Sequence, residues 1–497
     1  MKLFTIGDSI SQGFMSMAAA RTELSYSTLL ARCMGLVPGT DEYSIPMWGA
    51  GGLPFNIENL MRSLQRQYGA DIRGPIEWLA AVTSVNGFLD NIEDHYERGQ
   101  GNIALPQAGR RQFYPNVSVA GFTVADAWKV TPRLCLDRIA MDQEKNGGDG
   151  LFFSLPNCRF ERTAHAVLNP SRDPQYDDFS QLRWLEHHHV DGEGVENLIL
   201  WLGANNALGT IVRMDVMSTE EAEDPPLEMD LDQRNRFNLW TTEHFEAEYE
   251  ELMEKVHDTL TRGKCDCKVF IGTVPAVTIA PLARGVGNSR EEDDPFKVLK
   301  RATYFDRYTY FLFDHDYARR SGNSLTFEQA YQIDSTIAEY NKTIKRIVTA
   351  YNRKSRDTEG PKVEYFLVDI CDQLLRLAFK RNHGKPTYEL PQEIIDLNMR
   401  LGRTVDTVYY TVDRMGRMSA GGVFSLDGVH PTALGHGLIA LEFLKAFEKA
   451  KVPMVRGLDW NGIAASDSLY TNPISLMPEL YDNTRLAELL LDLLRLP

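Results

Sequence analysis

The sequence predicts an α/β fold in which a mainly parallel sheet carries helices on both faces. Apolar segments of strand length alternate with segments of helical periodicity from one end of the chain to the other. Stretches rich in glycine and polar residues follow several of the predicted strands. Ligand groups collect beyond the carboxyl ends of the strands in sheets of this kind. We therefore expect a functional site where these stretches meet.

The predicted elements follow from the spacing of apolar residues. The expected strands lie at residues 3–6, at the start of 114–128, and at 195–202, 268–274 and 363–370. The run from Val195 to Leu202 is almost continuously apolar, which is typical of a strand buried on both faces of a parallel sheet. The expected helices lie at residues 16–36, 56–68, 76–96, 245–261, 327–351 and 432–451.

The remaining segments are interpreted as insertions and an extension of one domain. We expect a single domain over residues 1–452 and a C-terminal extension over 453–497 that packs on the domain or on a partner subunit, which leaves a homo-oligomer open. The expected insertions, mostly helical, lie near residues 48–111, 142–193, 211–240, 285–325 and 381–422. The acidic stretch 214–235 predicts a mobile surface loop. The aromatic stretch 296–317 fits either an acyl pocket or lid, with Tyr304, Tyr308 and Phe311 as candidate substrate-binding residues, or a core element.

Composition excludes several classes of function. The 497-residue chain has a formal net charge of −16, which disfavours nucleic acid and anionic membrane surfaces as partners. Its six cysteines lack zinc-site spacing and predict free thiols in a reducing compartment. No segment has the length of a signal-peptide core or a membrane span, so we expect a cytoplasmic protein without stable membrane insertion. We expect no metal and no cofactor, and the adjacent histidines 187–189 are interpreted as packing or solvated residues.

The first predicted strand ends at Gly7 and delivers Ser9 into a turn, the way a serine nucleophile is presented at a strand end. A serine hydroxyl needs a general base and an orienting acid. Asp427 and His430 lie three residues apart just before a predicted helix, so both side chains can lie on one side of a turn. We predict a catalytic triad of Ser9, His430 and Asp427.

The other two strand-end stretches supply candidate oxyanion donors. Asn205 has a side-chain amide, and Gly121 and Ser9 have backbone N–H groups that together can stabilise a tetrahedral oxyanion. Gly121 suits this role because the absence of a Cβ lets a substrate approach its amide closely. Asp8 is interpreted as a structural residue of the turn, and His436 as a helix residue near the site.

Four motif blocks in this order resemble those of the SGNH (GDSL) hydrolases. The blocks are Gly7-Asp8-Ser9, Gly121 within residues 116–123, Gly203-Ala-Asn205-Asn206, and Asp427-Gly-Val-His430-Pro-Thr. The resemblance covers the core units along nearly the whole chain but not the insertions. It differs at Asn206, where the family commonly has Asp.

The resemblance implies a flavodoxin-like three-layer α/β/α sandwich and a serine esterase or lipase that works through an acyl-serine intermediate. By resemblance, Ser9 is the nucleophile, His430 the base, Asp427 its partner, and Ser9, Gly121 and Asn205 the oxyanion hole. The aromatic insertions favour a lipid-like or other apolar acyl group on a small-molecule or lipid ester. A carbohydrate O-acetyl esterase and a non-catalytic scaffold that keeps the motif residues are the alternatives, and acyl transfer to an alcohol stays open.

Overall fold

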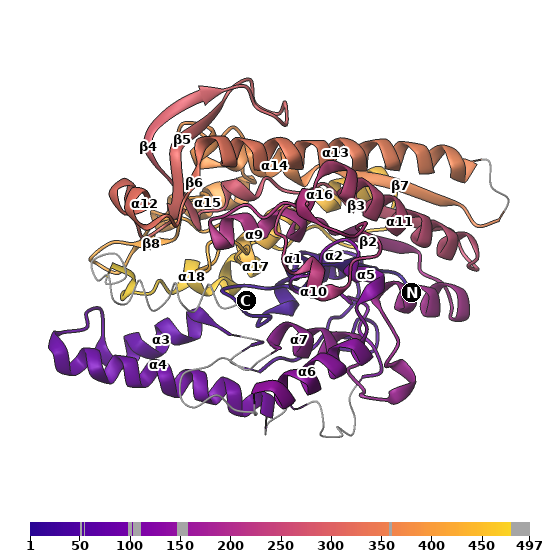
Figure 1. Ribbon diagram of the computed structural model, residues 1–497, viewed down its shortest axis with the longest axis horizontal. Helices are drawn as coiled ribbons and strands as arrows, with labels where there is room; N and C mark the ends of the chain where they lie inside the picture. Colours follow the sequence, from indigo (N-terminus) through magenta and orange to yellow (C-terminus); the bar gives the residue numbers. More distant parts are fainter. Residues whose placement is uncertain are drawn as a thin grey trace.

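The computed structural model describes residues 1–49, 52–53, 55–97, 102, 111–146, 158–356 and 360–478. In this part of the chain the central sheet has four parallel strands, which follow one another across the sheet as β1 (Phe4–Gly7), β2 (Asn197–Trp201), β3 (Cys267–Gly272) and β7 (Val363–Val368). Thr5 pairs with Ile199, and Leu198 pairs with Val269. The predicted α/β fold with a parallel sheet is confirmed (Figure 1).

A fifth segment extends the ladder on the free side of β1. The Thr5 amide donates to the Pro115 carbonyl at 2.9 Å, Val117 donates to Thr5 at 3.0 Å, and Val119 donates to Gly7 at 3.2 Å. The predicted strand near residue 114 is thus present as pairing, although only a single bridge between Thr5 and Asn116 is regular. Pro115 has no N–H to give to the ladder, which weakens regular strand geometry here.

Helices pack on both faces of the sheet, and the principal ones are α2 (Tyr26–Cys33), α11 (Thr242–Thr261), α13 (Phe327–Arg356) and α16 (Ala433–Lys449). The Phe447 ring of α16 lies 4.0 Å from the Phe270 ring of β3. On the other face, His257 Nδ1 of α11 lies 2.8 Å from the Tyr365 hydroxyl of β7. Successive side chains of a strand point to opposite faces. The next residue, Phe366, therefore lies on the face of α16, where its ring stacks on that of Phe270.

The two insertions predicted near residues 48–111 and 142–193 contain helices, as expected. Their described parts, together with the segment between them, include α3 (Ile57–Tyr68), α4 (Gly74–Glu97), α6 (Pro132–Asn146), α7 (Arg159–Leu168) and α8 (Gln181–Glu186). Figure 1 shows α3, α4, α6 and α7 on the same side of the molecule.

The expectation of helical insertions is wrong for residues 285–325 and only partly right for 381–422. The first forms an antiparallel sheet of β4 (Ala283–Glu292), β5 (Ala302–Tyr310) and β6 (Leu325–Thr326). A short helix, α12 (His315–Ser321), lies between β5 and β6 along the chain. The second contains α15 (Gln392–Leu401) and a hairpin of β8 (Thr411–Val412) and β9 (Met418–Ala420). Aromatic residues and threonine dominate β5, and both favour a pleated, half-buried strand over a helix.

The acidic stretch 214–235 ends in an ordered helical turn, α10 (Leu231–Arg234), where a loop was expected. The Asp230 carboxylate accepts from the Gln233 amide at 2.8 Å, and the Gln233 side chain accepts from the Asp230 amide at 2.8 Å. This reciprocal pair is a capping box. Arg234 at the end of the turn is only 2% exposed, so the end of this stretch belongs to the interior.

The C-terminal extension packs on the domain as far as the structure describes it. The Val455 amide donates to the Cys33 carbonyl at 2.8 Å, and the Leu434 amide donates to the Asp467 carboxylate at 3.0 Å. The helices here are α17 (Trp460–Ser466) and α18 (Ser468–Thr471). The leucine-rich end from residue 483 lies outside the described residues. Within the described part of the chain, no helix combines the length and apolarity that a membrane crossing requires.

Shorter elements complete the description: α1 (Ser9–Gln12), α5 (Asp126–Lys129), α9 (Asn205–Arg213) and α14 (Ile370–Leu377), 3-10 turns at Thr22–Leu24, Pro174–Tyr176, Thr219–Glu221, Val277–Ile279 and Phe379–Arg381, and a π turn at His187–Asp191. The helix predicted over residues 16–36 begins only at Tyr26. Ser16 and Met17 have φ angles of 50° and 65°, which no right-handed helix contains.

Candidate active site

Ser9 is the first residue of the single-turn helix α1, directly after β1. The Asp8 carboxylate caps this turn by accepting from the Ile10 amide at 3.1 Å, as expected for a structural residue of the turn. Gly7 is required at the strand end, because a Cβ there would lie 2.3 Å from the Ser11 hydroxyl. Ser9 is 5% exposed, so this residue is almost completely buried at the end of β1.

Asp427 and His430 lie on a tight loop before α16. The Ser425 amide donates to the His430 carbonyl at 2.8 Å, and the Gly428 amide donates to the Ser425 carbonyl at 2.9 Å. Gly428 has a φ of +68°, and a Cβ on it would lie 2.8 Å from the backbone nitrogen of Leu282. The glycine is therefore needed both for the backbone angle and for the close approach of the chain.

The structure brings the three predicted triad residues into one hydrogen-bonded chain. His430 Nδ1 lies 2.7 Å from Asp427 Oδ2, and His430 Nε2 lies 2.9 Å from Ser9 Oγ. A serine, a histidine and a carboxylate in this order form the arrangement in which the histidine removes the hydroxyl proton and the carboxylate orients the ring.

The Asp427 carboxylate is fully hydrogen-bonded. Oδ1 accepts from the amides of Val429 and His430 at 2.8 Å each, and Oδ2 accepts from the Met17 amide at 2.8 Å. Burial alone raises the pKa of Asp427, but attraction to His430 and these hydrogen bonds outweigh it, so the pKa lies below its ordinary value. Asp427 is therefore a carboxylate at neutral pH.

Ser16 and Met17 contact the site through their backbone amides, which the sequence did not predict. Their left-handed backbone turns the Ser16 amide toward the Ser425 hydroxyl, at 2.8 Å, and the Met17 amide toward Asp427. Left-handed conformations are uncommon for residues other than glycine and are kept where the surroundings require them. Nothing in the sequence signals this contact, since more than 400 positions separate its partners.

The predicted oxyanion donors lie at the boundary between two cavities. Asn205 Nδ2 donates one proton to the Phe122 carbonyl at 2.9 Å, which leaves its second N–H for a ligand. Gly121 has a φ of +83°, an angle that favours glycine. Among the described residues, no protein atom accepts a hydrogen bond from the amide of Ser9 or of Gly121. These N–H groups can therefore donate hydrogen bonds to a ligand, as an oxyanion hole requires.

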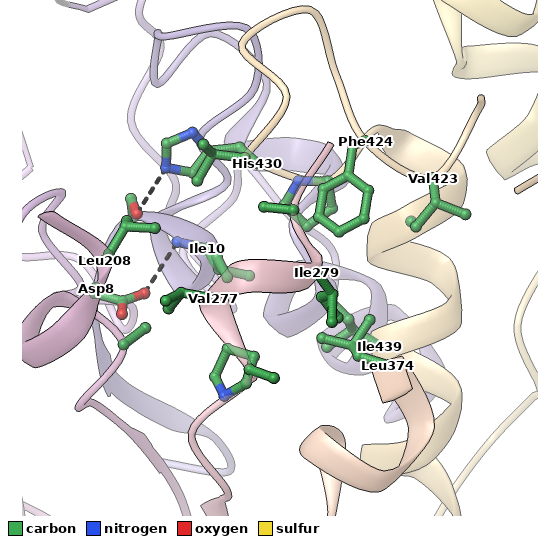
Figure 2. Close-up of a pocket in the computed structure, with 18 of the residues that line it drawn as sticks. Asp8, Ile10, Leu208, Val277, Ile279, Leu374, Val423, Phe424, His430 and Ile439 are labelled. Carbon is green, nitrogen blue, oxygen red and sulfur yellow. Dashed lines mark hydrogen bonds between the residues drawn. The ribbon is translucent and has the colours of Figure 1, made fainter. Parts of the chain in front are cut away.

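The first cavity, named here the apolar cavity, lies beside Ser9 and has a volume of about 50 Å³. Figure 2 shows Val277, Ile279 and Phe424 among its labelled side chains, together with His430. Its other apolar lining residues come mainly from the loop after β3 and from α14 and α16, and include Leu374, Leu377, Leu438 and Ile439. Asn205 borders this cavity and the second one.

The second cavity, named here the charged cavity, has a volume of about 480 Å³ and includes Gly121 and Asn205 in its wall. Charged side chains distinguish it from the apolar cavity, and those on its wall are Asp126, Arg159, Glu161, Arg213 and Arg234.

The structure does not bring the candidate substrate-binding residues to either cavity. Tyr304 and Tyr308 lie in β5 with buried side chains, and their hydroxyls bond to Asp334 and Arg381 at 2.8 Å each. Phe311 stacks on Tyr409 with ring centroids 3.4 Å apart. The interpretation of these aromatic residues as a core element therefore replaces their assignment to a pocket.

Phe311 instead contacts the segments that adjoin the loop of Asp427 and His430. Its amide donates to the Leu282 carbonyl at 3.0 Å, and the Leu282 amide donates to the Gly428 carbonyl at 3.0 Å. Its stacking partner Tyr409 donates from its hydroxyl to the Leu426 carbonyl at 2.5 Å. These contacts hold the segment that carries Asp427.

The remaining histidine predictions concern residues outside the triad. His189 Nε2 lies 3.0 Å from the Leu260 carbonyl, and the His188 ring stacks on Trp184, so these two neighbours pack in the interior. Among the residues the structure describes, no three His, Cys, Asp or Glu side chains are grouped as metal ligands. His436 lies in α16 as expected, and its Nδ1 accepts from the Tyr26 amide at 3.3 Å.

No protein-family model matches the chain, and no curated protein matches its sequence. The functional argument therefore depends on the motif blocks and on the geometry of the site.

Proposed function

We propose that the protein is a serine hydrolase of carboxylic esters and a member of the SGNH (GDSL) hydrolases. The observation that carries the proposal is the hydrogen-bonded chain from Asp427 through His430 to Ser9, with 2.7 Å and 2.9 Å between the paired atoms. The Asp427 end of this chain is held by three backbone amides, those of Met17, Val429 and His430.

In the proposed reaction, Ser9 Oγ attacks the ester carbonyl carbon while His430 Nε2 takes the hydroxyl proton. The carbonyl oxygen becomes an oxyanion, which the amides of Ser9 and Gly121 and the free N–H of Asn205 stabilise. His430 returns the proton to the leaving alcohol as the C–O bond breaks. Water then attacks the acyl-serine by the same route and releases the acid.

The order of the paired segments supports a flavodoxin-like three-layer sandwich for the proposed family. Residues 115–119 pair with β1 on one side, and β2, β3 and β7 follow on the other. Numbered along the chain, this order is 2-1-3-4-5, the order of flavodoxin-like sheets. In such sheets ligands bind at the carboxyl ends of the strands where the order reverses, and Ser9 follows β1 at that point.

The size of the apolar cavity favours a short acyl group. The expectation of a lipid-like group depended on the aromatic stretch 296–317, and that stretch does not line the cavity. An engineered cavity of about 150 Å³ holds one benzene ring, whereas the apolar cavity has about 50 Å³. We infer an acyl group of a few carbons, which also keeps acetyl esters of polar alcohols such as carbohydrates as candidate substrates.

A reducing compartment such as the cytoplasm fits this proposal. All six cysteines lie in the described part of the chain, and each is a free thiol. Free thiols are typical of proteins in a reducing compartment, whereas cysteines that come close to each other form disulfides in an oxidising one.

The test is labelling by a fluorophosphonate, followed by hydrolysis of nitrophenyl esters of increasing acyl length. We expect labelling of the wild-type protein, none of Ser9→Ala, and the highest kcat/KM for acyl chains of two to four carbons. Ser63→Ala, which changes a serine on α3 outside both cavities, is the matched control and should label like the wild type. An unlabelled wild-type protein would contradict catalysis and favour the scaffold alternative.

A further inference from the structure

The charged cavity offers binding capacity that the proposed hydrolysis does not use. It has about 480 Å³ against about 50 Å³ for the apolar cavity. Asn205 borders both, so a substrate whose carbonyl lies at the oxyanion donors has the apolar cavity on one side and the charged cavity on the other. If the acyl group fills the apolar cavity, the alcohol portion of the ester faces the charged cavity.

Among the described residues, Arg159 on the wall of the charged cavity is buried without an ion pair, and its guanidinium lies 5.2 Å from the centroid of the Phe160 ring. Arg159 is the first residue of α7 and is 4% exposed, and among the described residues its Nε and Nη2 atoms have no hydrogen-bond partner. Burial lowers the pKa of Arg159 to about 10, so the guanidinium is still charged at neutral pH. Buried charged groups are normally paired, because an unpaired one loses its hydration without compensation. Within the described part of the chain, this arginine therefore has no carboxylate at ion-pair distance.

The other charged side chains on the wall, apart from Arg213, lie near an opposite charge, although Asp126 Oδ1 and Arg234 Nε have no hydrogen-bond partner among the described residues. Arg234 donates to Glu248 and lies 3.7 Å from Asp126. Glu161 accepts from Arg138 at 3.0 Å.

Arg213 donates to the backbone carbonyl of Asn235 at 3.3 Å, and no ion pair of its guanidinium is present among the described residues. The two carboxylates of the wall are thus engaged by Arg234 and Arg138, while Arg159 and Arg213 keep positive charge available to a ligand.

Arg159 lies beside the proposed reaction centre. Its neighbour Phe160 is so close to Gly121 that a Cβ on this glycine would lie 3.7 Å from the Phe160 ring. The first residues of α7 and the oxyanion donor Gly121 therefore form adjoining parts of one wall. A group held by Arg159 would belong to the same substrate molecule as the scissile ester.

We propose that the charged cavity binds an anionic oxygen group, such as a carboxylate, on the alcohol portion of the ester, and that Arg159 pairs with it. Arginine suits this task because its planar fork of N–H groups matches two oxygens of one anion. The inference extends the proposed ester hydrolysis and rests on it: it names the substrate class as short-chain acyl esters of an acidic alcohol.

The experiment compares 3-acetoxybenzoate with its uncharged methyl ester, methyl 3-acetoxybenzoate. The readout is the ratio of kcat/KM for the anionic ester to that for the neutral ester. We expect this ratio to fall about 10- to 100-fold in Arg159→Gln, the effect of losing a hydrogen-bonded charge partner. The intrinsic reactivities of the two esters cancel when the ratio is compared between enzymes.

Arg162→Gln is the matched control, because Arg162 is also buried on α7 but is not among the described residues that line the charged cavity. It should keep the wild-type ratio. Arg159→Lys, which keeps a positive charge, should restore part of the preference, and thermal melting reports whether each variant is folded. An unchanged ratio in folded Arg159→Gln, or an equal fall in Arg162→Gln, would overturn the proposal.

Failure of the proposed function looks different. In that case neither ester is hydrolysed and no fluorophosphonate label appears. Calorimetry with 3-hydroxybenzoate and 3-hydroxybenzamide then still tests the anion site, because it requires no catalysis. Tighter binding of the acid than of the amide, lost in Arg159→Gln, supports the anion site, whereas equal binding of both compounds by the wild type would overturn it.

Discussion

Two buried carboxylates of this protein sit in networks that are chemically alike but open to different degrees. Asp427 bonds to His430, which continues to the Ser9 hydroxyl at the wall of a cavity. Asp334 bonds to Arg381 at 2.9 Å, and both side chains are fully enclosed. The first, named here the open network, ends in a hydroxyl that a substrate can reach. The second, named here the enclosed network, has contacts only with other parts of the protein.

The neighbours of the enclosed network supply most of its hydrogen bonds, and Arg381 Nε is the atom of this pair without a partner among the described residues. Asp334 also accepts from the hydroxyls of Thr278, at 2.5 Å, and Tyr304, at 2.8 Å. Arg381 donates to the Thr303 carbonyl at 2.9 Å. A buried pair of this kind fixes the arrangement of the segments it joins, but it offers nothing to a ligand. The comparison teaches that burial and pairing do not identify a catalytic group, whereas an accessible end of the network does.

The largest effect that separates the two networks is expected in Asp427→Asn. The amide cannot hold His430 in the tautomer that accepts the Ser9 proton, so we expect kcat to fall about 10⁴-fold. Ester hydrolysis with a short acyl chain measures this loss, and urea unfolding checks that the fold remains. A kcat within tenfold of the wild-type value would show that Asp427 does not orient the base.

The opposite outcome is expected for Arg381→Met. This change leaves Asp334 buried without its cation, and breaking a buried pair in this way costs about 3–5 kcal/mol of the free energy of unfolding. Urea unfolding measures the loss, while kcat per folded molecule should stay close to the wild-type value. The double variant Asp334→Leu with Arg381→Met is the control and should recover much of the stability, because it removes both charges.

The residues of the open network were predictable from the sequence, but the residues that contact and position them were not. Ser9, Asp427 and His430 follow strand ends or precede a helix, and such positions are visible from apolar periodicity and glycine placement. Ser16 and Met17 were expected to be helical, because their neighbours have helical spacing. Their amides instead bond to the loop that carries Asp427, and a contact across about 410 residues leaves no trace in local periodicity.

The enclosed network was interpreted differently for the same reason. Tyr304 and Tyr308 were candidates for the substrate pocket because they stand in an aromatic stretch. Their roles are set by Asp334 and Arg381, which come from α13 and from the turn after α14, and by the hairpin of β4 and β5. The parallel sheet was predictable because each strand is a local apolar run, whereas the partners of a buried tyrosine depend on tertiary packing.

Asn205→Ala sharpens the comparison with a residue that stands beside the open network without belonging to it. Removing one oxyanion donor is expected to lower kcat about 10²- to 10³-fold. Asn205 also bonds to the Phe122 carbonyl, so a small loss of stability is expected as well. Asn91→Ala, which changes an exposed asparagine on α4 outside both cavities, is the control and should keep kcat near the wild-type value. An effect on KM alone would place Asn205 in substrate binding instead of transition-state stabilisation.

Asp8 is a third buried carboxyl, and unlike Asp427 and Asp334 it has no side-chain hydrogen-bond partner among the described residues. Burial raises its pKa from 3.8 to about 7, and the hydrogen bond from Ile10 and the attraction of His430 offset this only in part. The folded state therefore keeps a proton that the unfolded chain releases above about pH 4. The stability due to Asp8 is fully present below pH 4 and is lost as the pH rises toward 7.

Asp8→Asn cannot titrate, so between pH 4 and pH 8 its unfolding free energy should fall less than that of the wild type, by about 1–3 kcal/mol. Parallel pH dependences in urea unfolding would mean that Asp8 is ionised in the folded protein, and Asp8 would then resemble Asp427 instead of differing from it.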